Sequence, residues 1–485
     1  MRNALALMLF AAACGSKTPP TAPPPPPPTG DTGTTTAAKP DDSMPALEAP
    51  TKPVTTKSLA AIGLDPDSLD RTADPCDDFY QFACGGYIAK TEIPADKPIT
   101  MRSFVAISDR NLEYEKSILE TAASKPGDDA ILKQLGTFYG SCMNETAVEK
   151  AGFAPIKPLL AQIDKVKDAK SLSAAVTQLQ INGIPAVFNF GPTQDAADAT
   201  REIAEIEQGG LGLRDRDYYL KDDEQTKKIR AAYHDFIASA LVDVGHKPDD
   251  AAKQADAVIG LETSLAKVSK DKVALRDPKG MYNRLDRDGV AKAMPHFEWE
   301  SFWKGVGLGT VKDVTVGSPD FLTGVDVLIQ ATPMNVWRDY LTAVTVRSAA
   351  GFLDKKLEDQ AFLLRATITG QKEMESRWKR CTGRTDAALG DLLGQAFVRD
   401  KFGGQSKQAA EEQVHAIVTA MTANLAALPW MDAETKVKAA AKLNAMTYQI
   451  GYPKKWRTYA FKLDAKNWGG NALASNRAEK ARQLA

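Results

Sequence analysis

The sequence predicts a mainly α-helical fold that contains, at most, a small β element. Apolar residues recur at helical spacing over most of the chain after residue 57, whereas segments with alternating apolar and polar residues are few. The composition, with 43% hydrophobic and 25% charged residues, is that of a globular protein. The length after residue 57 allows for more than one domain.

The helices are predicted from apolar residues that share one face. In the segment after Asp129, residues 131, 135, 138 and 142 are apolar, and residues 172, 175, 176 and 179 form a second such face. The turn-forming residues 182–185 (NGIP) end that second helix. Asp432 is the predicted N-cap of a helix that begins at residue 433. The other helical runs cover residues 104–123, 225–245, 251–269, 336–379, 408–427, 433–447 and 472–485.

Two segments are candidates for extended structure. Residues 186–190 are the better one, because they form a short apolar run after a turn signal. Residues 201–207 are the weaker one, because Ile203 and Ile206 are three positions apart and do not alternate as strand residues do. We therefore expect no more than a small sheet.

The first 56 residues predict an export signal followed by a tether. Residues 1–14 have one basic residue, a short apolar run and the sequence AAAC. This sequence is similar to the acylation site of bacterial lipoproteins, although the usual leucine is replaced by Ala11. Residues 15–56 are rich in Pro and Thr and contain no aromatic side chain, which predicts a disordered tether.

The signal also predicts a location. We expect an exported protein whose Cys14 carries a lipid that anchors it to the bacterial cell envelope, with the outer membrane as the expected site. Ordinary signal cleavage, which would give a periplasmic or secreted protein, stays open. The membrane is expected to be a partner only through this lipid. Nucleic acid is not an expected partner, because 62 acidic and 61 basic residues nearly cancel and no basic stripe stands out.

No active site is recognisable from the residues alone. The four histidines, at positions 234, 246, 296 and 415, are far apart, and none lies three or four residues from another, so the chain has no HExxH zinc helix. The sequence Gly209-Gly210-Leu211-Gly212 lacks the spacing of a phosphate-binding loop, and no GxSxG segment is present.

The most informative segment is residues 74–87, DPCDDFYQFACGGY. Cys76 and Cys84 are eight positions apart, which is too far for a CxxC metal or redox motif. They can be read as small buried side chains or as disulfide cysteines, and the export signal favours disulfides. Gly85 and Gly86 are expected to permit a tight backbone turn.

Residues 74–87 closely resemble the opening signature of the neprilysin and endothelin-converting-enzyme family of zinc metallopeptidases. Several further segments resemble this family in the same order along the chain, although Arg214 stands where the family usually has proline. The segments are 93–96 (IPAD), 139–144 (YGSCMN), 210–219 (GLGLRDRDYY), 377–381 (RWKRC), 430–435 (WMDAET) and 450–453 (IGYP). The resemblance covers the chain from about residue 56 to Ala485.

This resemblance implies a large helical lobe of a two-lobed zinc metalloendopeptidase. The family holds zinc with the two histidines of HExxH and a downstream glutamate, and the glutamate within HExxH activates the zinc-bound water. None of these parts occurs in the sequence. We therefore expect residues 57–485 to be the family's N-terminal region, truncated before the catalytic half, with no catalytic residue and no bound zinc of its own. Apolar surface that normally closes the chamber between the lobes would then be exposed.

The resemblance also assigns roles to the cysteines. It implies a disulfide between Cys142 and Cys381, which would close a long loop. The family's counterparts of Cys76 and Cys84 pair with cysteines near the distant C-terminus, so here these two would be free, paired with each other, or paired with another chain. Cys14 is the residue assigned to the lipid.

One substrate contact follows from the resemblance. The family often has an arginine four residues before the counterpart of Phe104, where it can bind a peptide carboxylate. That position is Thr100 here, and Arg102 lies two residues later. Arg102 is therefore the candidate substrate-binding residue, against the alternative of a surface residue at a helix entry.

Three functions remain open. The first is the N-terminal portion of a zinc endopeptidase of peptide substrates that is inactive as this chain alone. The second is a lipid-tethered lobe that binds peptides or a partner without catalysis. The third is one half of a split peptidase, with a separate catalytic-half chain as its partner.

Overall fold

The computed structural model describes residues 65–101 and 104–485, which form parts of two compact units, Met1–Lys90 and Thr91–Ala485. The predicted signal and tether, residues 1–56, lie outside the described residues. The described part of the first unit contains a short 3-10 helix, η2 (Pro66–Ser68), and one α-helix, α1 (Phe79–Lys90).

The two glycines of the signature segment lie inside α1, so the predicted tight turn at Gly85 and Gly86 is wrong. The structure gives Gly86 a different role. A Cβ atom there would lie 2.4 Å from the carbonyl oxygen of Asp67, so only glycine lets α1 approach the backbone of η2 this closely. Gln81 Nε2 of α1 also donates a hydrogen bond to Asp70 Oδ2 at 2.7 Å, which holds α1 against the segment that follows η2.

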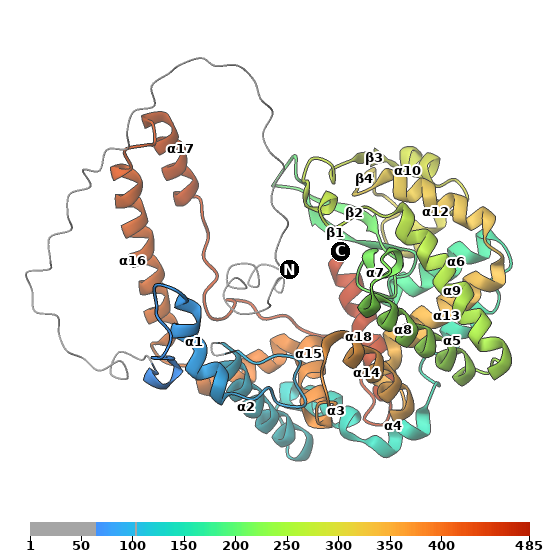
Figure 1. The fold of residues 1–485 in the computed structure, drawn as a ribbon, viewed down its shortest axis with the longest axis horizontal. Coiled ribbons are helices and arrows are strands. Elements are labelled where there is room, and N and C mark those ends of the chain that lie inside the picture. Colours follow the sequence, from blue (N-terminus) through green and yellow to red (C-terminus); the bar gives the residue numbers. More distant parts are fainter. Residues whose placement is uncertain (1–64, 102–103) are drawn as a thin grey trace, which may run out of the picture. The chain divides into compact units, whose positions relative to one another are not determined.

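The second unit is mainly helical (Figure 1), which confirms the predicted fold class. Its α-helices are α2 (Phe104–Ser124), α3 (Ala130–Met143), α4 (Glu145–Ala151), α5 (Lys157–Ile163), α6 (Ala169–Ile181), α7 (Asp217–Leu220), α8 (Glu224–Asp243), α9 (Pro248–Val268), α10 (Arg287–Ala293), α11 (Trp299–Gly305), α12 (Pro319–Ala331), α13 (Met334–Ala349), α14 (Lys355–Thr369), α15 (Arg377–Lys401), α16 (Ser406–Ala427), α17 (Ala433–Asn444) and α18 (Trp468–Gln483). Two 3-10 turns, η3 (Ala274–Arg276) and η4 (Ala350–Phe352), lie between them.

Local signals set several of these helix ends. Asp432 caps α17 as predicted, because its side chain accepts a hydrogen bond from the Thr435 N–H at 2.8 Å. The single helix predicted over residues 336–379 is wrong. The structure breaks it at η4, starts α14 with the Asp354 N-cap and ends α14 at Gly370, whose φ of +77° favours glycine.

The sheet has four strands in the order β1-β2-β4-β3. Strands β1 (Phe188–Gln194) and β2 (Glu202–Gln208) pair antiparallel, β2 pairs parallel with β4 (Asp313–Val316), and β4 pairs antiparallel with β3 (Arg284–Asp286). The weaker strand candidate is therefore a true strand. Ile203 and Ile206 point to opposite faces of β2 and are both buried, so apolar residues need not alternate there.

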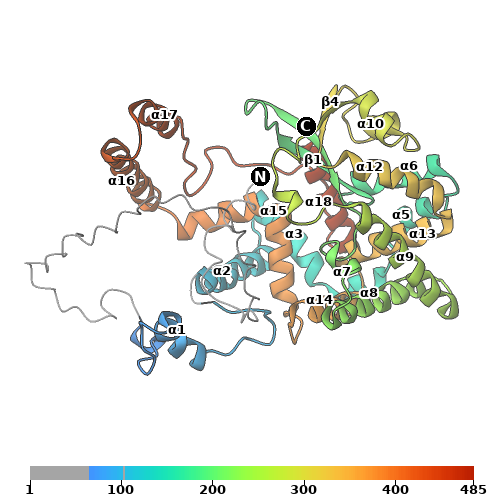
Figure 2. The same ribbon diagram turned by 45° about the horizontal axis from the view of Figure 1, so that its top comes forward.

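Two hydrophobic cores stabilise the second unit. The first lies between one face of the sheet and helices α5–α13, and Phe188 packs there against Trp299 and Phe302 with ring centroids 5.5 Å apart. The second lies between α2, α3, α15 and α18, where the rings of Phe138 and Trp468 are 5.2 Å apart. Helix α18 ends beside β1 in both views (Figures 1 and 2), and Lys480 Nζ donates to the carbonyl oxygen of Phe190.

Candidate functional site

The histidines of the described chain do not fit a zinc site. His296 Nδ1 lies 2.9 Å from Asp326 Oδ2, and His246 Nδ1 lies 3.0 Å from Gln254 Oε1, so both rings are engaged with other side chains. Over residues 65–101 and 104–485, no three His, Cys, Asp or Glu side chains gather in a way that could hold a metal ion. The side chains in this part of the chain therefore do not match the zinc ligands that the resemblance implies for the family.

A cluster of buried polar side chains in the second unit surrounds Glu262 of α9. This side chain is fully buried, and its two oxygens accept hydrogen bonds from the hydroxyls of Tyr219 (2.5 Å) and Tyr233 (2.8 Å). The Tyr219 hydroxyl also accepts a hydrogen bond from the Leu213 N–H at 2.8 Å. Burial raises the pKa of Glu262 above its usual value, while the hydrogen bonds from the two tyrosines and the nearby Arg347 act in the opposite direction.

The same cluster holds the GLGLRDRDYY segment from the other side. Arg347 Nη1 donates to the carbonyl oxygen of Gly212 at 2.9 Å, and the Tyr340 hydroxyl donates to that of Gly210 at 2.8 Å. A Cβ atom at Gly212 would lie 1.7 Å from the Tyr233 hydroxyl oxygen, so the close approach requires glycine. The cluster therefore fixes the segment to α8, α9 and α13. Because Glu262 is fully buried, we interpret it as a structural site.

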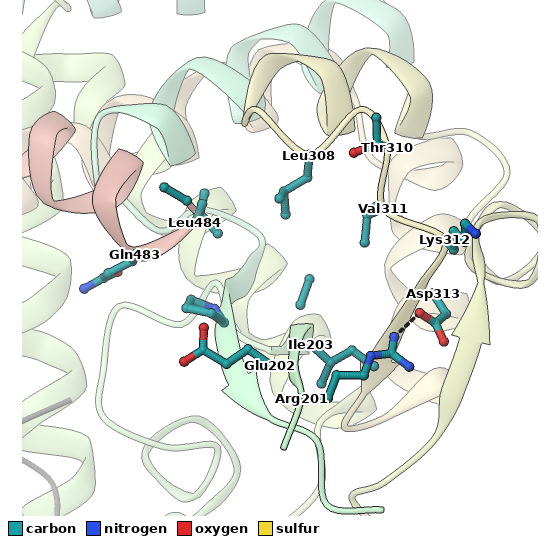
Figure 3. Close-up of a pocket in the computed structure, with 13 residues that line it drawn as sticks. Arg201, Glu202, Ile203, Leu308, Thr310, Val311, Lys312, Asp313, Gln483 and Leu484 are labelled. Carbon is teal, nitrogen blue, oxygen red and sulfur yellow. Dashed lines mark hydrogen bonds and ion pairs between the residues drawn. The ribbon is translucent and has the colours of Figure 1, made fainter. Parts of the chain in front are cut away.

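A cavity of about 420 Å³ lies beside the sheet (Figure 3). Its wall combines apolar side chains, such as Ile203 and Leu308, with the Arg201–Asp313 ion pair. The full lining is Pro192, Arg201, Glu202, Ile203, Ala204, Leu308, Thr310, Val311, Lys312, Asp313, Gln483, Leu484 and Ala485. This wall can hold a small apolar group, and one of its carboxyl groups, that of Asp313, is paired with Arg201.

Helices α16 and α17 and the residues next to them expose several large apolar side chains. Every residue of the 22-residue α16 is at least partly exposed, and α17 buries only Leu443. The exposed fractions of Trp430, Val437 and Ile417 are 74%, 70% and 64%. We call the exposed apolar set the hairpin surface; it consists of Ile417, Met421, Trp430, Val437, Met446 and Tyr448. Several exposed large apolar side chains within one segment are typical of a site where another polypeptide packs.

The structure places the predicted cysteines as follows. Cys142 of α3 and Cys381 of α15 form a disulfide bond, with Cα atoms 5.8 Å apart and 239 positions of sequence between them. Cys76 lies in the turn before α1, is exposed, and has no disulfide bond in the described part of the chain. Cys84 lies within α1 and is half-buried. Cys14 lies outside the described residues.

Arg102 also lies outside the described residues, so its predicted substrate contact stays a prediction. The sequence pattern contains no indication of Glu262, because a single glutamate within a helical run is ordinary. The only signal is the pair of tyrosines, Tyr219 and Tyr233, spaced along two neighbouring helical segments, and it does not identify their shared partner. The family resemblance predicts exposed apolar surface, but it does not locate that surface at α16 and α17.

The helical architecture, the small sheet and the Cys142–Cys381 bond are the features that the resemblance to the neprilysin-like metallopeptidases implies. The family model described as Peptidase family M13 matches residues 75–453, and the chain belongs to this family. This confirms the resemblance stated from the sequence motifs. Members of this family are zinc metallopeptidases.

Curated relatives support the assignment. The chain is 32% identical to an endothelin-converting enzyme homolog of Locusta migratoria over 409 residues, which cover 79% of this chain and 55% of the relative. It is 28% identical to endothelin-converting enzyme-like 1 of Mus musculus over 433 residues, which cover 84% of this chain and 55% of the relative. The chain therefore spans about half the length of the curated relatives it matches.

A solved structure shares the fold. The zinc metalloprotease ZMP1 of Mycobacterium tuberculosis, determined in complex with an inhibitor, matches with a TM-score of 0.80 and 31% sequence identity, covering 87% of this chain and 64% of that protein. A second structure, PEPO from Lactobacillus rhamnosis, matches with a TM-score of 0.73 at 21% identity, which supports the fold alone. None of the described helices is long and apolar enough to cross a membrane.

Proposed function

We propose that this chain is the N-terminal, helical portion of a zinc metalloendopeptidase of the bacterial cell envelope. Zinc ligands and the general base would come from polypeptide outside residues 1–485, either as a continuation of the chain or as a separate chain. When bound there, zinc would polarise the scissile peptide carbonyl and lower the pKa of a water molecule. The role of the present residues is to bind that catalytic portion and to shape the substrate chamber.

The observation that carries this proposal is the hairpin surface. Trp430, Val437 and Ile417 expose most of their area to solvent, although burying such a side chain contributes about 1.5–3 kcal/mol. The match covers 55% of each of the two curated relatives, whose remaining residues would be available to cover such a surface. The sequence itself contains no HExxH, so catalysis by residues 1–485 alone is not expected.

The test is reconstitution. The purified chain is assayed for bound zinc and peptidase activity alone, and then after addition of a separately expressed HExxH-containing half of an M13 peptidase from the same organism. Zinc and chelator-sensitive activity that arise only after mixing would support the proposal. Peptidase activity of the chain alone would contradict it. The absence of zinc and activity in both samples would favour the alternative of a lipid-tethered lobe that binds peptides or a partner.

Charge substitutions locate the contact. Val437→Asp on the hairpin surface should abolish reconstitution, because it places a charge in a contact that must become dry. Val327→Asp is the matched control, since Val327 is also an exposed valine (57%) on a helix, α12, outside that surface. Equal loss of activity in both variants would show that the hairpin surface is not the docking site.

A further inference from the structure

Two glutamates on the polar face of the sheet lack a partner among the described residues. Glu205 and Glu207 lie two positions apart on β2, so their side chains point to the same face, opposite to the buried Ala204 and Ile206. Both are half-buried, and neither side chain makes a hydrogen bond or an ion pair to any residue that the structure describes. Charged side chains that are withdrawn from water are normally paired.

The register of the sheet places a third polar group beside them. Thr315 of β4 is the direct partner of Glu205 and therefore points to the same face. It is only 3% exposed, and its hydroxyl oxygen has no hydrogen-bond partner among the residues with described positions. Buried hydroxyls almost always have such a partner. The free hydroxyl and the two carboxylates thus lie together on one face of the sheet.

On the other side of Glu205 there is open space. Gly191 of β1 is the direct partner of Glu205, and a Cβ atom built on Gly191 would meet no other described atom within 4 Å. We call Gly191, Glu205, Glu207 and Thr315 the acidic patch. A group could therefore lie over Gly191 and reach the oxygens of Glu205 without displacing any part of the sheet.

Two cations on neighbouring segments are already engaged. Arg284, the direct partner of Thr315 on β3, pairs with Asp313. Lys270 donates to the carbonyl oxygens of Gly280 and Gly317 at 2.7 and 2.9 Å. Burial raises the pKa of Glu205 to about 7, with the neighbouring Glu207 as the second cause, which is the behaviour of carboxylates that lack a counter-charge.

From this arrangement we propose that the acidic patch binds the basic side chain, Arg or Lys, of a peptide substrate. Two carboxylates and one hydroxyl supply too few oxygens for Ca²⁺, which takes six to eight, whereas they match the donors of a guanidinium or ammonium group. The hydroxyl accepts one donor and the carboxylates neutralise the charge. This inference rests on the proposed function, because it specifies which peptides the lobe selects.

Direct binding tests the inference independently of catalysis. The probes are two fluorescein-labelled peptides of alanine and glycine that differ at one central position, with arginine in one and its uncharged analogue citrulline in the other. Fluorescence anisotropy with the full chain should show that the arginine peptide binds at least about tenfold more tightly, as expected for a charged hydrogen bond. Peptide binding in this assay requires no zinc. The result can therefore be interpreted even if the reconstitution of peptidase activity fails.

Substitutions test whether the preference for arginine over citrulline comes from the acidic patch. Glu205→Gln and Glu207→Gln should each reduce the preference for arginine several-fold, and the double variant should remove it. Glu202→Gln is the matched control, because it removes the same charge from the other face of the same strand and should leave the preference unchanged. Gly191→Leu keeps both carboxylates but fills the open space, and it should also remove the preference.

The inference is overturned by several clear results. These are equal affinity for the two peptides, no binding of either, or a preference for arginine that survives in the folded double variant. Circular dichroism and thermal unfolding check that each variant folds. If the double variant does not fold, Thr315→Val decides: it removes only the unpaired hydroxyl, and an unchanged preference in both Thr315→Val and Gly191→Leu would contradict the proposal.

Discussion

The hydroxyl of Tyr219 donates a 2.5 Å hydrogen bond to Glu262 Oε2 in the interior of the protein, across 43 positions of sequence. This bond connects the end of the GLGLRDRDYY segment to the middle of α9. It also provides one of the hydrogen-bond donors that make a fully buried carboxyl group tolerable. The most recognisable internal motif of the chain is therefore held by a residue outside the motif.

Removing that donor should destabilise the protein. Tyr219→Phe leaves Glu262 Oε2 and the Leu213 N–H without a partner, and we expect a loss of about 1–3 kcal/mol in the free energy of unfolding. Urea unfolding followed by circular dichroism measures it. Tyr218→Phe is the control, because the Tyr218 hydroxyl makes no hydrogen bond in the described part of the chain. Equal effects of the two substitutions would refute the role assigned to the network.

A methyl group at Gly212 should be just as damaging. Gly212→Ala would force the Tyr233 ring away from Glu262, and we expect a cost of about 1–3 kcal/mol from overpacking. Gly260→Ala is the matched substitution: Gly260 lies within α9 with open space around its Cβ position, so alanine there should stabilise by about 0.5–1 kcal/mol. Thermal unfolding of both variants should therefore show shifts of opposite sign.

Much of the fold could be predicted because helical periodicity is a local signal. The faces containing Leu135 and Leu179 are helices as predicted, and Asp432 is an N-cap as predicted. The break at residues 350–354 was missed, because apolar periodicity continues across it and only Asp354 and Gly370 mark the new helix ends. The strand at residues 202–208 was underrated, because its burial on both faces depends on elements distant in sequence.

The candidate sites were predicted less well, for a related reason. Glu262 matters because the fold brings hydrogen-bond donors to its side chain. Glu205 and Thr315 matter for the opposite reason, because their side chains have no hydrogen-bond partner among the described residues. Their spacing in sequence carries no motif. The disulfide pair Cys142 and Cys381 followed from family resemblance, since no spacing rule connects cysteines 239 positions apart.

Loss of the disulfide should weaken the second core. Cys381→Ser should lower the free energy of unfolding by about 2–5 kcal/mol, because the bond restricts the unfolded chain. The measurement is urea unfolding with and without a reducing agent. Dithiothreitol should lower the stability of the wild type but leave Cys381→Ser unchanged. Cys76→Ser should behave as the wild type, and a similar loss in that control would mean that the effect does not come from the Cys142–Cys381 bond.

The unpaired carboxyl of Glu205 predicts a pH dependence. Its pKa is raised from 4.5 to about 7 in the folded state. Between these two pH values, the folded protein therefore holds a proton on Glu205 that the unfolded chain has released. Its favourable contribution to stability is therefore complete below about pH 4.5 and lost as the pH rises through about 7. Glu205→Gln cannot titrate, so its melting temperature relative to the wild type should increase between about pH 4.5 and pH 8.

The control for this experiment is Glu202→Gln, because the Glu202 side chain is exposed on the same strand. This variant measures how the loss of one carboxyl group from an exposed position of β2 affects the melting temperature. A difference between Glu205→Gln and the wild type that does not change with pH would contradict the raised pKa of Glu205.

The proposed lipid anchor gives a cellular prediction. Cys14→Ser removes the acylation site, so the protein should move from the membrane pellet to the soluble or culture fraction, and mass spectrometry should find no diacylglycerol-modified N-terminal peptide. Cys76→Ser should leave the distribution as in the wild type. If the wild type and Cys14→Ser were both found in the soluble or culture fraction, ordinary signal cleavage would be favoured instead.

The disulfide between Cys142 and Cys381 also determines how the chain responds to mechanical load. Tension applied to the backbone on both sides of the bond passes directly from one sulfur atom to the other, and the 239-position loop, which contains the sheet and the first core, carries none of it. Reduction of the bond would place this loop in series with the rest of the chain and release about 800 Å of extended polypeptide. The sheet and its acidic patch are thus shielded from tension by a single covalent bond.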